Sequence, residues 1–181
     1  MSANSKVIAI SGVSGSGKTT VTKALVQQLH NAKTFYFDTY DVEGPEDIVK
    51  WVEQGANYNE WDLSPLHTDI QSSLDQSYDY IILDYPFAYQ NEQIARLIDC
   101  AIFIDTPLDV ALARRIVRDS SNESTDEILN SMKHYLANGR KGYTQMLNTI
   151  KPDSDIIVEG NQSIDKIVEY IKSKIWGVKI G

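Results

Sequence analysis

The sequence predicts an α/β fold in which helices cover both faces of a five-stranded parallel sheet. Segments with helical periodicity separate five short apolar runs, at residues 7–10, 34–37, 80–83, 101–104 and 156–158. Strands that alternate with helices indicate βαβ units, which place parallel strands in one sheet. The 181 residues are a length typical of one domain and contain no internal repeat. We therefore expect a three-layer α/β/α sandwich in a single domain spanning residues 1–181.

The predicted helices begin at residues that favour helix starts. Pro45 suits the first turn of a short helix, and Ser64-Pro65 repeats the signal for a helix that ends near residue 74. Thr106-Pro107 is expected to cap a helix that ends near Arg118. Further helices are predicted at residues 19–30, 163–176 and 125–150, the last with a break at residues 138–139.

Composition and charge disfavour several classes of function. Hydrophobic residues make up 42% of the chain and charged residues 23%, as in soluble globular proteins. The net charge of −8 argues against binding to nucleic acid, which needs clustered Lys and Arg. No apolar run approaches membrane-spanning length, and residues 1–6 lack the apolar region of a secretory signal. We expect a cytoplasmic protein that binds neither nucleic acid nor membrane; a homo-oligomer is compatible with the sequence.

A phosphate-binding motif lies between the first predicted strand and the first predicted helix. The run Gly12-Val-Ser-Gly-Ser-Gly-Lys-Thr19 matches G-x-x-x-x-G-K-[ST], the P-loop pattern, at every fixed position. Glycines allow the backbone to direct amides at phosphate oxygens, and the positive end of the helix points the same way. Lys18 can reach the β- and γ-phosphates, and the Thr19 hydroxyl can ligate Mg²⁺. The residues expected to hold the nucleotide are Gly12, Val13, Ser14, Gly15, Ser16, Gly17, Lys18, Thr19 and Thr20.

Two carboxylates are expected beside this motif, because ligands of α/β sheets collect at the carboxyl ends of the strands. Asp84 follows the apolar run 80–83, which has the form of a Walker B site, and we expect it to organise Mg²⁺ with Thr19. Asp38 is expected to be a second metal-associated acid or the base that accepts the substrate proton. Asp84 could instead be a solvated acid at a strand end, and Asp38 could be a turn-forming residue at the start of a loop. Asp105 also follows a strand and is assigned to the entry of the next helix.

Two arginines near the end of the helix that follows Pro107 are candidates for phosphate contacts. Arg115 and Arg118 are three residues apart, so they are predicted to share a helix face. Arginine can neutralise the charge that spreads over phosphates during transfer. Basic residues are also favoured in a last helical turn by the helix dipole, and the spacing does not separate the two interpretations.

These residues resemble the uridine kinase and phosphoribulokinase family of P-loop kinases over about residues 6–160. The run Phe37-Asp38-Thr39-Tyr40 resembles the family's segment that supplies the catalytic base, and residues 59–62 resemble its Asn-Trp-Asp stretch. Residues 102–119 resemble the strand and lid helix that carry its phosphate-binding arginines. The resemblance implies a strand order of 2-3-1-4-5, bound ATP and Mg²⁺, and Lys18, Asp38, Arg115 and Arg118 as catalytic residues.

The sequence departs from the family's pattern in two places. The family continues after the lid helix with Glu-Arg-Gly-Arg, whereas this chain has Ser120-Ser-Asn-Glu-Ser124. The lid, at about residues 114–140, is therefore expected to be short and to lack two arginines. Residues 65–78 have room for one helix but not for the β-hairpin with which uridine kinases help to hold the nucleoside.

The acceptor site is expected among polar and aromatic residues near these motifs. We assign it to Tyr40, Tyr58, Trp61, Asp62, Tyr85 and Arg140. The predicted function is transfer of the γ-phosphate of ATP to a hydroxyl of a small molecule, which is nucleoside-like, a vitamin or a sugar. The alternative, motivated by the thinned lid, is a regulator that binds ATP without transferring phosphate. The sequence identifies neither the acceptor nor the preference for ATP over GTP.

Overall fold

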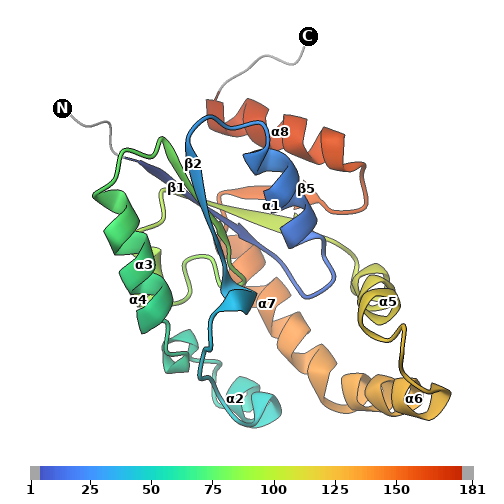
Figure 1. Cartoon of the computed structure of the whole chain (residues 1–181). Coiled ribbons are helices and arrows are strands. Elements are labelled where there is room, and N and C mark those ends of the chain that lie inside the picture. The colour runs from blue at the N-terminus through green and yellow to red at the C-terminus, as the bar shows by residue number, and fades with distance from the viewer. Residues whose placement is uncertain (1–4, 177–181) are drawn as a thin grey trace.

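A computed structural model describes residues 5–176, in which five parallel strands form one sheet (Figure 1). The strands are β1 (Lys6–Ser11), β2 (Ala32–Tyr36), β3 (Tyr80–Asp84), β4 (Cys100–Asp105) and β5 (Ile156–Glu159). Their order across the sheet, β2-β3-β1-β4-β5, confirms the predicted order. β1 lies at the centre and pairs in parallel with β3 and β4.

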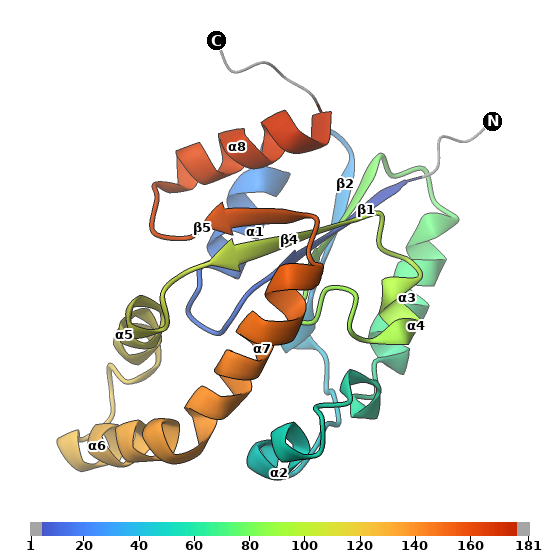
Figure 2. The ribbon, with the colours of Figure 1, turned by 180° about the vertical axis from the view of Figure 1, so that it is seen from behind.

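Helices bury both faces of the sheet (Figures 1 and 2). One face is covered by α1 (Lys18–Val26) and α8 (Ile164–Trp176), and the other by α3 (Ser64–Leu74), α4 (Glu92–Ala95) and α7 (Arg140–Asp153). β1 supplies both cores, because successive side chains of a strand point to opposite faces. Val7 and Ala9 pack on the α3 side, and Ile8 and Ile10 pack on the α1 side.

Three further helices lie around the carboxyl ends of the strands: α2 (Ile48–Glu53), α5 (Leu108–Asp119) and α6 (Thr125–His134) (Figure 1). Parallel α/β sheets bind their ligands at this edge. Two short 3₁₀ turns, Phe37–Thr39 and Tyr58–Glu60, lie in the connections between β2 and α3. Within residues 5–176, no helix combines the length and the apolar character that a bilayer crossing requires.

A π-helical segment, Tyr135–Gly139, joins α6 to α7. The predicted break at residues 138–139 falls within this segment, which interrupts the α-helix, although Gly139 keeps a helical φ of −61° and the chain stays coiled. A π-helical turn holds an extra residue, so it changes the direction of the helices it joins. Figure 2 shows α6 and α7 running in different directions on either side of it.

Several helix boundaries correct the predictions. α2 begins at Ile48 rather than Pro45, because the Asp47 side chain caps it by accepting the Lys50 amide at 3.0 Å. Thr106 does not cap α5, since its hydroxyl donates to the carbonyl of Ser16 at 2.8 Å. α1 ends at residue 26 rather than 30, and the short α4 was not predicted. α3 begins at residue 64 with proline in its first turn, as predicted.

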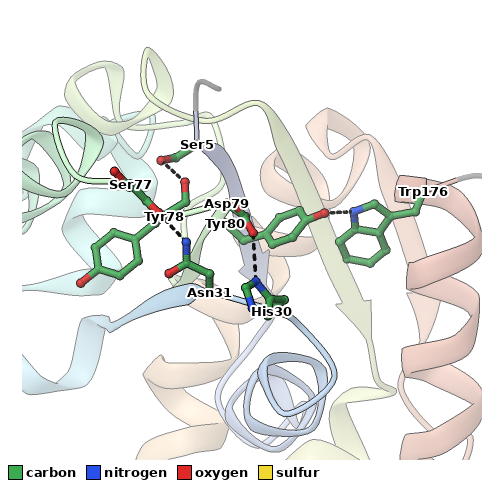
Figure 3. A network of polar contacts seen from close by, with 8 residues as sticks. All are labelled: Ser5, His30, Asn31, Ser77, Tyr78, Asp79, Tyr80 and Trp176. Carbon is green, nitrogen blue, oxygen red and sulfur yellow. Dashed lines mark hydrogen bonds and ion pairs between the residues drawn. The ribbon is translucent and has the colours of Figure 1, made fainter. Parts of the chain in front are cut away.

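The amino-terminal ends of the strands are fastened by a polar network (Figure 3). The Trp176 indole N–H donates to the Tyr80 hydroxyl at 2.7 Å, which joins α8 to β3. The Ser5 hydroxyl donates to the Tyr78 carbonyl at 2.6 Å, which joins the residue before β1 to the same region. This network lies at the opposite end of the strands from the loop between β1 and α1.

Candidate active site

The loop between β1 and α1 is a tight turn that depends on glycine. Gly12, Gly15 and Gly17 have φ angles of 147°, 84° and 100°, which side-chain-bearing residues rarely adopt. A Cβ atom at Gly15 would lie 2.1 Å from the carbonyl oxygen of Ala111 in α5. The loop is therefore packed directly against the start of α5, and Thr106 holds its other side through the Ser16 carbonyl.

The first turn of α1 is suited to an anion. α1 begins at Lys18, and Gly17 at its N-cap has no side chain to accept hydrogen bonds from the first-turn amides. Helix amino-terminal ends attract anions through these amides and the helix dipole. Lys18 adds a full positive charge, so the loop and the helix end together fit the phosphates of a nucleotide.

A carboxylate and a hydroxyl meet beside this turn. The Thr19 hydroxyl donates to Asp84 at 2.5 Å, and Asp84 is only 5% exposed at the end of β3. Burial raises the pKa of the Asp84 carboxyl, while the charge of Lys18 and the hydrogen bond from Thr19 lower it. The charge of Asp38 raises this pKa further, which places Asp38 within electrostatic range of Asp84.

Thr19 and Asp84 fit a bound Mg²⁺ only when a nucleotide is bound as well. Thr19 and Asp84 supply hydroxyl and carboxylate oxygens, which Mg²⁺ prefers. The described chain contains no group of three His, Cys, Asp or Glu residues placed to hold a metal ion. The remaining ligands of a Mg²⁺ here would be phosphate oxygens and water, as is usual for this ion.

A cavity of about 540 Å³ opens over the turn. It is lined by Ser14, Gly15, Gly17, Lys18, Thr19, Thr20, Lys23, Asp38, Arg114 and Arg118. Asp38 reaches it from the 3₁₀ turn after β2, and the arginines reach it from α5. The structure thus brings Lys18, Asp38 and Arg118 to one cavity, although they come from three separate parts of the chain.

Arg114 lines this cavity and was missed in the sequence. Its guanidinium donates to the carbonyl of Gly160 at 3.1 Å and lies 3.5 Å from that of Ser16. Arg114 and Arg118 are four residues apart, a spacing that places side chains on one helix face. The spacing of three residues between Arg115 and Arg118 also predicts a shared face, so spacing alone does not favour Arg114 over Arg115.

Of the two arginines singled out in the sequence, Arg118 lines the cavity over the turn and Arg115 does not. Arg115 donates to the Tyr143 hydroxyl and lies 5.5 Å from the ring centroids of both Tyr143 and Tyr135. It is therefore enclosed by aromatic residues of the π-helix and α7. Its polar partner is a tyrosine, and it also borders a small cavity that Val13 and Ser14 of the phosphate-binding turn line.

Arg118 is paired with its neighbour at the edge of the cavity. Its guanidinium donates to both carboxylate oxygens of Asp119, at 2.6 and 2.9 Å, and its side chain is 61% exposed. The hydrogen bonds to Asp119 raise the pKa of Arg118, and the charges of Asp38 and Tyr143 raise it further. Arg118 therefore lies near both Asp38 and Tyr143.

A second cavity, of about 710 Å³, lies between α2 and the helical segment formed by the π-helix and α7. It is lined by Glu46, Asp47, Ile48, Val49, Trp51, Tyr58, Trp61, Phe87, His134, Asn138, Gly139, Gly142, Tyr143 and Met146. We call it the aromatic cavity. Tyr143 lines the aromatic cavity and accepts a hydrogen bond from Arg115.

Of the six residues assigned to the acceptor, Tyr58 and Trp61 line the aromatic cavity. Tyr85 does not, because it is fully buried in the core, where its hydroxyl has no hydrogen-bond partner among the described residues. Burial raises the pKa of Tyr85 well above its ordinary value. Phe37, next to Asp38, packs against this group, with ring centroids 6.0 Å from Tyr85 and 6.4 Å from Trp61.

The other three assigned residues lie away from the aromatic cavity. Tyr40 donates its hydroxyl to Asp69 of α3 at 2.8 Å. Asp62 accepts the amide and the hydroxyl of Ser64, at 3.0 and 2.6 Å, and so precedes α3 as a turn residue. Arg140 is exposed at the start of α7. The structure therefore does not assemble the six residues into one site.

Asp105 also has a role other than the predicted one. Its carboxylate forms an ion pair with Lys151 of α7 at 2.6 Å, and its carbonyl accepts the Gly160 amide at 2.8 Å. These contacts join the end of β4 to α7 and to the connection between β5 and α8. Asp105 thus fastens the sheet edge beside the phosphate-binding turn rather than entering α5.

Comparison with known families identifies the chain. Residues 2–147 match the family described as the AAA domain, and this range covers most of the chain. The chain belongs to the AAA domain family. The match includes the turn at Gly12–Thr19, Asp38, Asp84 and the arginines of α5, so every residue that lines the cavity over the turn lies within the matched range.

Curated relatives of this AAA domain protein bear out the resemblance to uridine kinases. Uridine kinase-like protein 5 of Arabidopsis thaliana is 28% identical over 93% of this chain. The uridine kinase of Limosilactobacillus reuteri is 28% identical over the same share, and that of Schizosaccharomyces pombe is 29% identical over 92%. The chain spans 43% and 44% of the plant and yeast relatives, but 89% of the bacterial one.

Solved structures share the fold of this AAA domain protein. A sugar kinase from Janibacter sp. HTCC2649 superposes with a TM-score of 0.58 at 16% identity, over 93% of each chain. The protein TT1252 from Thermus thermophilus superposes with a TM-score of 0.59 at 17% identity, over 99% of this chain and all of its own. At such identities the likeness is one of fold, and a P-loop fold of this kind implies nucleotide binding.

Proposed function

We propose that this AAA domain protein is an ATP-dependent kinase that phosphorylates a hydroxyl group of a small molecule. The observation that carries the proposal is the cavity shared by Lys18, Asp38 and Arg118. A phosphate-binding turn alone would serve any nucleotide-binding protein, whereas a carboxylate facing that turn supplies a proton acceptor for an attacking hydroxyl. The similarity to uridine kinases over most of the chain supports the same reaction type.

The triphosphate of ATP would occupy the turn at residues 12–19, with its β- and γ-phosphates near Lys18. Thr19 and Asp84 would hold Mg²⁺, which neutralises phosphate charge when it is bound. Beyond Arg114 a smaller cavity of about 240 Å³ continues towards Gly160 and α8. Asp38 does not line this smaller cavity, so the nucleoside half of ATP would extend into it, away from the proposed base.

The transfer step would consist of one displacement. Asp38 accepts the proton of the acceptor hydroxyl, whose oxygen forms a bond to the γ-phosphorus as the bond from that phosphorus to the bridging oxygen of ADP breaks. Negative charge then grows on the leaving ADP and on the transferred group. Lys18, Arg114 and Arg118 line the cavity in which this charge develops, so they would stabilise it.

Arg118→Ala is expected to lower kcat by about 10- to 100-fold while changing KM for ATP by less than about threefold. The reason is that Arg118 is largely exposed and paired with Asp119, so it would contribute most when charge develops on the phosphates. Steady-state kinetics on an accepted alcohol measure both constants. Arg96→Ala removes an exposed arginine of the connection after α4 and is the matched control. Unchanged kinetics for Arg118→Ala would mean that Arg118 only stabilises the last turn of α5 through the helix dipole.

Uridine and cytidine are expected to be poor acceptors, with kcat/KM below about 10⁴ M⁻¹s⁻¹, the lower end of the usual range for enzymes. Between Asp62 and β3 the described chain holds α3 and no hairpin that could enclose a nucleoside. A site without the partner groups for a polar ligand discriminates strongly against it. A coupled assay of ADP release measures kcat/KM for both nucleosides. A value above about 10⁴ M⁻¹s⁻¹ would make this chain an ordinary uridine kinase.

A further inference from the structure

Much of the wall of the aromatic cavity consists of ring surfaces, which come from Trp51, Tyr58, Trp61, Phe87 and Tyr143. Trp51 and Tyr58 meet edge to face with centroids 5.0 Å apart, and Trp61 lies 5.0 Å from Phe87. The polar atoms of Trp51 and Tyr58 form hydrogen bonds with residues that do not line the cavity. The Trp51 indole N–H donates to the Asn57 carbonyl at 3.0 Å, and the Tyr58 hydroxyl lies 2.9 Å from that of Thr149.

The charged side chains at the α2 side of this cavity are carboxylates. Glu46 and Asp47 line it, and the lining drawn from residues 5–176 includes no Lys or Arg. Asp47 already caps α2 through the Lys50 amide, whereas Glu46 forms no hydrogen bond or ion pair with any described side chain. His134 is the one imidazole in the lining, and it lies 3.3 Å from the Asn138 amide.

Two arginines lie outside the cavity, beyond Tyr143 of its α7 side. Tyr143 accepts a hydrogen bond from Arg115, and Arg118 lies within electrostatic range of Tyr143 and Asp38. Neither arginine lines the cavity, so a cation inside it would be drawn to the carboxylates at the α2 side. Phe37, the residue before Asp38, packs against Trp61 and Phe87 of the lining with ring centroids 6.4 and 5.5 Å apart, so another wall of the cavity lies beside the segment that carries Asp38.

We propose that the aromatic cavity holds the phosphate acceptor and selects an alcohol that contains an aromatic ring and a positively charged nitrogen. Ring faces attract such a cation through their quadrupoles, and Glu46 adds a carboxylate near it. The same arrangement disfavours acceptors that carry a carboxylate or a phosphate, since these would meet Glu46 and Asp47 without a cation to pair with. The inference names the substrate class of the proposed kinase and rests on that function.

The test uses three probes that share one ring and differ in charge: benzyltrimethylammonium, benzyl alcohol and benzoate. Two of the chain's three tryptophans, Trp51 and Trp61, line the cavity, so their fluorescence reports binding without turnover. The third tryptophan, Trp176, lies against Tyr80. The titrations therefore use the Trp176→Phe variant, in which this tryptophan adds no fluorescence. The titrations are made at pH 8, above the range in which an imidazole ordinarily takes up a proton, and at low ionic strength.

We expect benzyltrimethylammonium to bind at least about tenfold more tightly than benzoate, with benzyl alcohol between them. Glu46→Gln should weaken binding of benzyltrimethylammonium by about threefold to tenfold and leave the affinity for benzyl alcohol unchanged, because only the cation interacts with the lost charge. Glu169→Gln removes an exposed acid from α8, at the far end of the molecule from α2 (Figure 1), and should change nothing. Equal affinities for the three probes, tightest binding of benzoate, or no binding of any probe would overturn the inference.

Calorimetric titration with Mg²⁺-ATP separates this inference from the function on which it rests. If Mg²⁺-ATP binds and the probes show no preference for the cation, the acceptor class is wrong and the proposed kinase stands. If the cation is preferred and Mg²⁺-ATP does not bind, the cavity selects cations but the proposed kinase function fails. Neither result depends on finding the natural acceptor.

Discussion

Asp38→Asn is expected to lower kcat on the acceptor by at least ~100-fold, the usual scale for a positioned general base, with little change in ATP affinity. Asparagine keeps the size of the side chain but cannot accept the hydroxyl proton. The loss of the Asp38 charge also removes one of the influences that raise the pKa of Asp84, so the proposed Mg²⁺ ligands should be at least as well ionised as before. Steady-state ADP release and calorimetric titration with Mg²⁺-ATP give the two quantities.

The matched control for this variant is Asp41→Asn, which removes an exposed acid three residues further along the same connection. Asp41 does not line the cavity over the phosphate-binding turn, so its variant should keep the activity of the parent. Turnover of Asp38→Asn within about threefold of the parent would show that Asp38 is not the base, because loss of a general base has a far larger effect.

Lys18→Ala is expected to weaken Mg²⁺-ATP binding by at least about 100-fold while leaving the thermal unfolding of the protein nearly unchanged. The affinity falls because a lysine that faces two phosphates loses several charge-assisted contacts at once, each worth about 1.5–3 kcal/mol. The fold survives because the Lys18 side chain lines a cavity and belongs to neither apolar core. Calorimetry measures the affinity, and circular dichroism follows the unfolding.

Lys166→Ala provides the comparison for this variant, since Lys166 is an exposed lysine of α8 and lies outside the cavity. It should bind Mg²⁺-ATP like the parent protein. Equal ATP affinities for Lys18→Ala and the parent would remove the assignment of a phosphate site to the turn between β1 and α1.

The parallel sheet could be predicted because its signals are local. Each strand is a short apolar run, and each is separated from the next by a helical segment. The P-loop was equally local, since one run of eight residues contains its glycines, lysine and threonine. The strand order came from the resemblance, because nothing in an isolated run shows which neighbour it pairs with.

The acceptor side could not be predicted in the same way, because its residues meet only through tertiary packing. Tyr143 lies on α7 and Glu46 precedes α2, about a hundred positions apart in the chain, and no spacing rule relates them. Tyr85 follows the apolar run 80–83 and was assigned to the site, yet the structure places it in the core behind Phe37. Aromatic side chains serve cores and binding sites equally well, so residue type alone could not separate the two.

The arginines of α5 illustrate an intermediate case. The sequence showed three arginines in five positions, and helical geometry allowed either Arg115 or Arg114 to share the face of Arg118. Their partners separate them: Arg114 donates to the Gly160 carbonyl, and Arg115 donates to the Tyr143 hydroxyl. Both partners lie on other elements further along the chain, so the sequence near the arginines does not reveal the difference.

The most direct test of the proposed kinase is a search for acceptor-dependent phosphomonoester formation. The protein is incubated with Mg²⁺-ATP and pooled nucleosides, vitamins, sugars and cationic aromatic alcohols, and ³¹P NMR follows ADP and new phosphomonoesters. The proposed function predicts that at least one pool yields a phosphomonoester in an amount equal to the ADP released, and that Asp38→Asn abolishes this product. Tight binding of Mg²⁺-ATP without a phosphomonoester in any pool would contradict a kinase and indicate a regulator that binds ATP.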